Sequence, residues 1–208
     1  MTNRQAAAPV AQRGRPRDPE TDRRIVDAAM ALYAEFGWSG FSFDLIARRS
    51  GVGKNAIYRR WNDKGALLAT LLDERWLSVE DIDTGSLRGD LTAFCDMLLD
   101  HYAGAFGSFG FQLHLDVMRH AEVEAATSDY RDSIKRSARN LVRAAIARDE
   151  LPVSAAPTLI LDVLAGSILS HVSATPPAMR EQMLAGADSF VANLVTLVLE
   201  GVSGSRAA

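Results

Sequence analysis

Residues 41–61 read FSFDLIARRSGVGKNAIYRRW, a pattern typical of two short helices joined by a tight glycine turn. Ser42 can cap the first helix, and Gly51 supplies the backbone freedom that the turn needs. In the second helix Ile57 and Trp61 are four residues apart, so both can face the core while the charged side chains face outward. The stretch therefore predicts a helix-turn-helix, whose second helix enters the major groove of DNA.

The outward side chains of the second helix fall into two chemical groups. Three at its N-terminal end can read bases, because lysine donates to guanine, asparagine pairs with adenine and alanine packs on the thymine methyl group. These three are Lys54, Asn55 and Ala56. The others suit phosphates, which fix position rather than sequence. They are Tyr58, Arg59, Arg60 and Lys64, together with Ser42 at a helix N-terminus. The alternative is an ordinary surface helix with solvated charges.

Residues 1–17 form a polar segment without an apolar period, and we expect them to be a disordered basic arm. The arm ends in RGRPR. Gly14 adds no side-chain bulk and Pro16 keeps the backbone extended, so Arg15 and Arg17 can enter a narrow minor groove. The alternative is a solvated tail that adds only non-specific attraction.

Composition places the chain among all-α proteins. Of its 208 residues 48% are hydrophobic, and these recur at helical spacing rather than in alternation. The one cysteine, Cys95, cannot form an internal disulfide, which suits the cytoplasm. We expect no signal sequence and no apolar run long enough to span a bilayer, since Asp162, Gly166 and Asn193 interrupt the longest stretches.

The net charge of −3 hides a strong asymmetry along the chain. Residues 1–64 hold 12 Lys+Arg and 7 Asp+Glu, a net +5, whereas the remainder holds 11 and 19, a net −8. A basic N-terminal part on an acidic body is expected when only that part meets phosphate. Chance segregation of surface charge is the alternative.

The longer stretch IVDAAMALYAEFGWSGFSFDLIARRSGVGKNAIYRRWNDKGALLATLL, residues 25–72, resembles the DNA-binding domain of the tetracycline-repressor (TetR) family of transcriptional regulators. The resemblance covers about residues 20–75. It rests on Phe36-Gly37, Ile46-Ala47 before Gly51-Val52, Ile57-Tyr58 before Trp61, and Lys64 before a leucine run.

The resemblance implies that Tyr58, Arg60 and Lys64 touch phosphates and that Lys54, Asn55 and Ala56 meet bases. Two positions depart from the family pattern. Gly53 stands where serine is common, so the second helix loses a side-chain cap, and Arg60 stands where histidine is common. The resemblance also implies a lever role for the helix that follows Lys64.

The implied organisation is a three-helix N-terminal helix-turn-helix domain over residues 18–64, a helical ligand-binding and dimerisation domain over residues 65–202, and a disordered tail over residues 203–208. About nine helices are expected in all, with residues 128–149 and 177–201 each forming one. Large side chains with some polar tips gather in the middle of the chain. A small-molecule pocket needs this mixture, although each residue alone also suits an ordinary core. The candidates are Phe94, Met97, His101, Tyr102, Phe109, Phe111, His114 and Met118.

The last two predicted helices are too broadly apolar for a single packing face, which favours a four-helix bundle with a second copy. The candidate interface residues are Leu159, Val163, Leu164, Gly166, Ile168, Phe190, Leu194 and Leu197. The alternative is a monomer that buries these helices in its own core.

Together these observations predict a cytoplasmic, homodimeric, ligand-responsive repressor that binds a palindromic double-stranded DNA operator. A DNA-binding regulator controlled by a protein partner, without a small-molecule effector, is the main alternative. An enzyme is the remote one, because no catalytic motif such as Gly-x-Ser-x-Gly, a phosphate loop or His-Glu-x-x-His is present. No cofactor and no metal site are expected, since the four histidines lack metal-ligand spacing.

Overall fold

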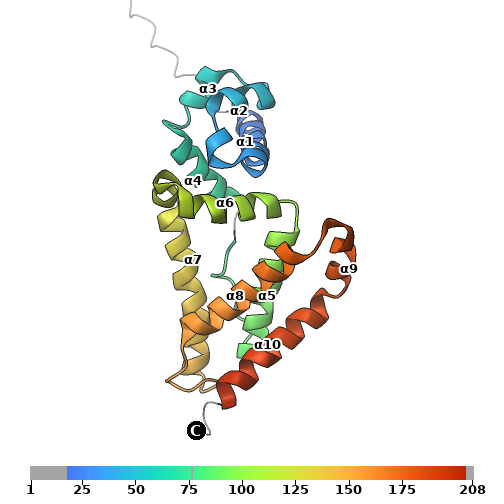
Figure 1. Cartoon of the computed structure of the whole chain (residues 1–208). Coiled ribbons are helices and arrows are strands. Elements are labelled where there is room, and N and C mark those ends of the chain that lie inside the picture. Colours follow the sequence, from blue (N-terminus) through green and yellow to red (C-terminus); the bar gives the residue numbers. More distant parts are fainter. Residues whose placement is uncertain (1–17, 76, 205–208) are drawn as a thin grey trace, which may run out of the picture.

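The structure, a computed structural model, describes residues 18–75 and 77–204. The predicted arm, with Arg15 and Arg17, and residues 205–208 of the predicted tail lie outside the described residues. Within the described ranges the chain forms ten α-helices, one short 3-10 helix and no strand, which confirms the all-α prediction. A smaller head, formed by the first three helices, stands above a larger helical body (Figure 1).

The head consists of α1 (Pro19–Gly40), α2 (Phe43–Ser50) and α3 (Lys54–Tyr58). Helix α1 begins at Pro19, because Asp18 accepts a hydrogen bond of 3.1 Å from the backbone N–H of Glu20 and proline occupies the first turn. Gly37 interrupts α1, with φ 60° and ψ −164°. A residue with a Cβ rarely adopts this backbone, so the break depends on glycine.

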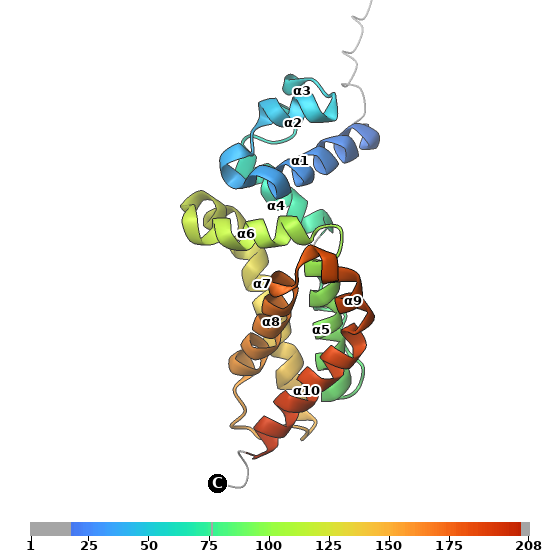
Figure 2. The same cartoon turned by 45° about the vertical axis from the view of Figure 1, so that its right-hand side comes forward.

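Helix α4 (Lys64–Arg75) leads from the head into the body. The body contains α5 (Leu87–Ala103), α6 (Gly107–Arg119), α7 (Ala121–Ala147), α8 (Pro157–Ala174), a 3-10 turn (Pro177–Met179), α9 (Arg180–Ala185) and α10 (Ala187–Gly204). Helix α6 lies across the molecule between the head and the remaining body helices in both views (Figures 1 and 2).

Two sequence expectations about these helices are wrong. Helix α7 begins at Ala121 rather than near residue 128. The single helix expected over residues 177–201 is instead bent by 70° between α9 and α10. Gly186 ends α9, since its N–H donates to the carbonyls of Gln182 and Met183 at 3.2 and 3.1 Å.

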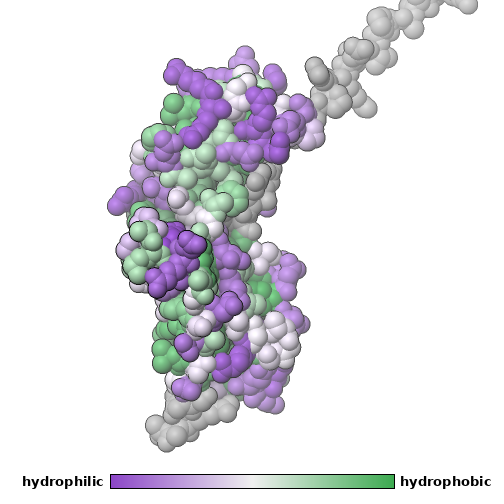
Figure 3. Space-filling view, turned by 90° about the vertical axis from the view of Figure 1, so that its right-hand side faces the viewer, coloured by the Kyte–Doolittle hydropathy of each residue, from purple (hydrophilic) through white to green (hydrophobic). Residues whose placement is uncertain are grey.

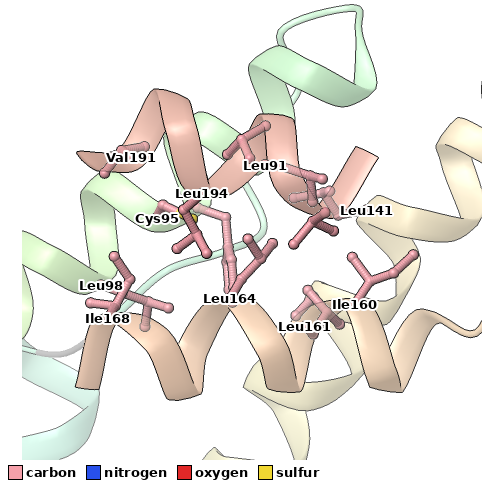
Figure 4. Packing of buried hydrophobic residues seen from close by; sticks show 14 of the residues in the cluster. Leu91, Cys95, Leu98, Leu141, Ile160, Leu161, Leu164, Ile168, Val191 and Leu194 are labelled. Atoms are coloured by element: carbon pink, nitrogen blue, oxygen red, sulfur yellow. The ribbon is translucent and has the colours of Figure 1, made fainter. Parts of the chain in front are cut away.

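The chain has two hydrophobic cores. The head core contains side chains of α1 to α4, and it is completed by Phe109 and Leu113 of α6 and Val123 of α7. The body core lies among α5, α7, α8 and α10, where Leu164, Leu194 and Leu141 converge (Figure 4). Because α6 contributes to the head core, a movement of α6 is transmitted to the head through direct packing.

Helix α8 is long and apolar enough, by length and composition alone, to cross a bilayer, with a mean hydropathy of 1.4. The expectation that no stretch reaches this limit is therefore wrong, because Asp162 and Gly166 lower the hydropathy of the helix too little. Only 28% of this helix is buried within the chain. The buried part belongs to the body core, so the rest of α8 needs a different explanation.

Candidate nucleic-acid interface

Helix α3 is held to the head by one face and leaves the other in solvent. Ile57 is fully buried beneath it. Lys54, Asn55, Tyr58 and Arg59 are exposed, and Ala56 is half-buried. The regular helix ends at Tyr58 instead of Trp61, although the N–H of Trp61 still reaches the carbonyl of Ile57 at 3.0 Å. The geometry thus presents the predicted base-reading residues together on one open surface.

Gly53 precedes α3 and offers no side-chain cap. A Cβ built at this position would meet nothing within 4 Å. Steric crowding therefore does not require glycine here, which is consistent with serine being common at this position in the family resembled. The sequence prediction that this helix lacks a side-chain cap is confirmed.

Lys54 contacts two residues of its own chain. Its ammonium lies 2.7 Å from a carboxylate oxygen of Asp44, the second residue of α2, and 5.7 Å from the ring centroid of Tyr58. The hydrogen bond with Asp44 raises the pKa of Lys54. The Tyr58 ring in turn packs edge-on against Phe43, with ring centroids 4.9 Å apart. These contacts tie the start of α3 to the start of α2.

The predicted phosphate-binding arginines differ in their availability. Arg59 is exposed, and no ion pair or side-chain hydrogen bond is recorded for it among the described residues. Arg60 is mostly buried: its guanidinium pairs with Asp22 of α1 and donates to the carbonyl of Ala56 at 2.9 Å. This placement gives Arg60 a role in holding α3 against α1, which the sequence reasoning did not foresee.

One basic residue that the sequence reasoning passed over lies on α2. Arg48 is exposed in the last turn of this helix, and among the described residues no partner is recorded for its side chain. Its neighbour Arg49 pairs with Glu35 at 2.7 Å. The signal that could have found Arg48 is its place in a short basic turn next to the glycine turn. Ser42 caps α2 as predicted, accepting from the N–H of Leu45 at 3.4 Å.

Lys64, the first residue of α4, contacts the end of α1. Its ammonium donates to the backbone carbonyl of Trp38 at 3.1 Å and lies 3.8 Å from the centroid of the Trp38 ring. Burial lowers the pKa of Lys64, and the carboxylates of Glu122 and Asp116 oppose that shift. The side chain is therefore a fixed, partly buried cation rather than a freely moving one.

The eight predicted ligand-binding residues lie in different surroundings. Phe94, Met97, Tyr102 and Phe111 pack in or against the body core, whereas Phe109 belongs to the head core. His114 and Met118 are exposed, the latter by 67%. Burial lowers the pKa of His101 to about 4, so this histidine is neutral at physiological pH.

Two cavities touch the helices expected to hold a ligand. One, of about 620 Å³, lies where α4 faces the start of α7; its walls include Trp38, Lys64, Ala69, Glu122 and Ala126. The other, of about 420 Å³, is polar and lies between α7 and the segment before α5; its walls include Glu80, Asp83, Asp90, Asn140 and Arg148. Neither is lined by the predicted ligand-binding residues.

The predicted interface residues divide between two faces of α8 and α10. Leu164, Ile168 and Leu194 are buried in the chain's own core, and Phe190 is half-buried and stacks on His171 with ring centroids 3.9 Å apart. The other predicted residues are exposed: Leu159 and Leu197 by 64% and 67%, together with Val163 and Gly166. Hydrophobic surface is also visible over the body in Figure 3.

Three of these exposed residues, Leu159, Val163 and Leu197, belong to a larger apolar groove. A cavity of about 460 Å³ lies along α8 and α10, with walls that include Leu159, Val163, Leu197, Val198 and Val202. No group of three or more His, Cys, Asp or Glu side chains that could hold a metal ion occurs among residues 18–75 and 77–204.

Comparison with known families matches both parts of the chain. The family described as "Bacterial regulatory proteins, tetR family" matches residues 25–71. The one described as "Tetracyclin repressor-like, C-terminal domain" matches residues 81–189.

Curated relatives agree with these matches. The HTH-type transcriptional regulator YdeS of Bacillus subtilis is 27% identical over 205 residues, covering 94% of this chain and 96% of that protein. The HTH-type transcriptional repressor SCO4008 of Streptomyces coelicolor is 36% identical over 88 residues, covering 42% of this chain and 45% of that protein.

Solved structures share the fold at low identity. GusR of Salmonella enterica superposes with a TM-score of 0.68 at 19% identity, covering 86% of this chain and 95% of that chain. FadR of Bacillus subtilis, solved in complex with stearoyl-CoA, superposes with a TM-score of 0.65 at 18% identity, covering 87% and 99%. With both halves of the chain matched and a helix-turn-helix exposed at its tip, the protein belongs to the TetR family of transcriptional regulators.

Proposed function

We propose that this regulator is a ligand-responsive repressor that binds a palindromic operator as a homodimer. The observation that carries the proposal is the exposed face of α3, where Lys54 and Asn55 stand side by side at the end that enters the groove. Tyr58, Arg59, Arg48 and Lys64 surround them with groups that suit phosphates. Arg60 contributes by fixing α3 on α1.

Pairing of two copies is supported by the apolar groove along α8 and α10. Leu159, Val163 and Leu197 would be exposed to water in a single chain, on helices whose opposite faces already fill the body core. A two-fold related copy would cover these side chains with its own equivalent face. The two heads would then meet two half-sites on one side of the duplex.

An effector is best accommodated in the cavity of about 620 Å³ between α4 and α7. Its walls include Lys64 at the start of α4 and Glu122 near the start of α7, so an occupant changes the separation of the two helices. Helix α4 carries the head, and a ligand that favours one separation shifts the population of head positions. The FadR structure was solved with stearoyl-CoA, which supports a small-molecule effector for this fold without identifying one here.

One observation favours the alternative, a regulator controlled by a protein partner. The aromatic residues expected to line a pocket are divided between the head core and the body core, with Phe109 in the former and Phe94 in the latter. Their size is thus used for packing. A body that binds no small molecule would leave thermal stability unchanged across a ligand library.

The decisive experiment is selection of bound sequences from a random duplex library by the full chain. We expect an inverted repeat, and we expect Lys54→Ala and Asn55→Ala each to relax preference within the half-site at a cost of about 1–3 kcal/mol per lost contact. Selected sequences without inverted symmetry would contradict the dimeric reading. An unchanged preference in both variants would contradict base reading by α3.

A further inference from the structure

Trp38 lies at the junction of head and body and is held from two directions. Its backbone N–H donates to a carboxylate oxygen of Asp116 on α6 at 2.8 Å. Its backbone carbonyl accepts from the ammonium of Lys64 on α4 at 3.1 Å, and its ring faces the same ammonium at 3.8 Å from the centroid. One residue of α1 therefore connects α6 with the first residue of α4.

The Asp116 side of this connection is buried and closely fitted. Asp116 is 3% exposed, and burial together with this carboxylate raises the pKa of the neighbouring Tyr33. A Cβ added to Gly37 would lie 2.4 Å from Nε2 of Gln112 and 2.9 Å from Oδ2 of Asp116. Gly37 thus provides both the positive φ and the space that bring the next N–H onto the carboxylate.

On the Lys64 side, the ammonium group can still donate hydrogen bonds to another partner. An ammonium group has three donors, and the Trp38 carbonyl uses one of them. A free lysine side chain loses conformational entropy when a binding partner fixes it. Contact with the Trp38 ring and carbonyl has already fixed Lys64, so a phosphate that meets it incurs less of this cost.

We propose that Asp116 is a positioning residue for DNA binding, which acts through Trp38 to hold Lys64 in place for a phosphate. The inference rests on the proposed function in one respect, the phosphate contact of Lys64. It extends that function because Asp116, a residue of the body 78 positions away from Trp38 in sequence, then contributes to DNA affinity. A movement of α6 would then change the affinity for DNA through Lys64, without any change in α3.

The positioning step can be tested without DNA. The ε-methylene protons of Lys64 lie against an indole ring and should show upfield-shifted NMR signals in the full chain, assigned by their loss in Lys64→Arg. Asp116→Ala removes the acceptor for the Trp38 N–H and should move these signals toward random-coil values. Asp116→Asn keeps an acceptor oxygen at the same distance and should retain the shift. Unchanged signals in Asp116→Ala would overturn the proposal.

The effect on binding is measured with a double-mutant cycle on one duplex at several salt concentrations. Lys64→Ala should weaken binding at least about fivefold and lower the salt slope by about one. Asp116→Ala should weaken binding in the wild-type background and have no further effect in the Lys64→Ala background. Asp116→Asn should stay within about twofold of wild type, as expected where the acceptor survives.

The outcomes separate the two claims. If Lys64→Ala leaves affinity and slope unchanged, the phosphate role of Lys64 is wrong, whereas the NMR result stands by itself. Additive losses from Asp116→Ala and Lys64→Ala, or tighter binding by Asp116→Ala, overturn the positioning role. Thermal unfolding confirms that each variant is folded. Should Asp116→Ala not fold, Asp116→Glu replaces it in both measurements, because its longer side chain displaces the acceptor from the Trp38 N–H; the same change of the NMR signals and the same non-additivity are expected.

Discussion

The ammonium of Lys54 lies 2.7 Å from the carboxylate of Asp44, so the first residue of α3 is paired with an acid on the surface expected to meet DNA. Both side chains are largely exposed, and such pairs contribute little to stability. If Lys54 contacts DNA as proposed, Asp44 should weaken binding, because its carboxylate competes with DNA for Lys54 and repels phosphate.

Replacing Asp44 by asparagine should therefore strengthen binding to any duplex. We expect a gain of up to about fivefold at low salt, the equivalent of an exposed charge pair, and a smaller gain at high salt. Fluorescence anisotropy at several salt concentrations measures it. Glu181→Gln on α9 changes the net charge equally but lies far from the head, and it should bind like wild type. Equal gains in both variants would indicate a general charge effect.

The neighbouring residues Arg59 and Arg60 should separate binding from stability. Arg60 is paired with Asp22 and donates to the Ala56 carbonyl, so Arg60→Ala should lower the free energy of unfolding by about 1–3 kcal/mol. Arg59 is exposed, and Arg59→Ala should change stability by less than about 0.5 kcal/mol while reducing the salt slope of DNA binding. Urea unfolding of both variants provides the comparison. Equal stabilities would refute the structural role of Arg60.

A charge on the exposed side of α8 or α10 should separate the two copies without unfolding them. Leu159→Glu and Leu197→Glu place the carboxylate in the apolar groove, and sedimentation should then give the mass of one chain. Leu164 is fully buried within the chain, so Leu164→Glu should instead unfold it. Leu115→Glu on α6 introduces the same charge at an exposed leucine elsewhere and should leave the mass unchanged. An unchanged mass in both groove variants would argue against this interface.

His101 should make the protein less stable in mild acid. Its folded pKa of about 4 lies below the unfolded value of 6.5, so between these two pH values the unfolded chain binds more protons. The free energy of unfolding therefore falls as pH is lowered from about 6.5 to 4, by at most about 3 kcal/mol from this residue. His101→Gln should flatten this dependence in urea titrations. If the free energy of unfolding of His101→Gln changed with pH as steeply as that of wild type, other titratable groups would account for the acid sensitivity.

The sequence predicted well those features that depend on local spacing. The helix-turn-helix, the cap by Ser42 and the exposed start of α3 follow from residues within one or two turns of each other. It predicted two apolar faces on α8 but not which face packs inside the chain. Periodicity shows that Leu159 and Leu164 point in different directions, but it does not show which of them is buried in the chain's own core.

Long-range contacts account for what the sequence could not show. The pairing of Trp38 with Asp116 joins residues 78 positions apart, and no local pattern indicates it. The large side chain of Phe109 suits the wall of a ligand pocket as well as a packed core. In the structure it packs against Tyr33, with ring centroids 4.9 Å apart, and belongs to the head core. Composition selects residues that suit a pocket or a core equally, and only the fold decides between them.

If two copies pair through the exposed groove of α8 and α10, as proposed, DNA binding depends on protein concentration in a particular way. When chains are scarce, the concentration of pairs able to grip two half-sites rises with the square of the chain concentration, by mass action. Repression then sets in over a narrow range of expression rather than in proportion to it. Under the proposed function, Leu159, Val163 and Leu197 would help to set the protein concentration at which the regulated promoter is repressed.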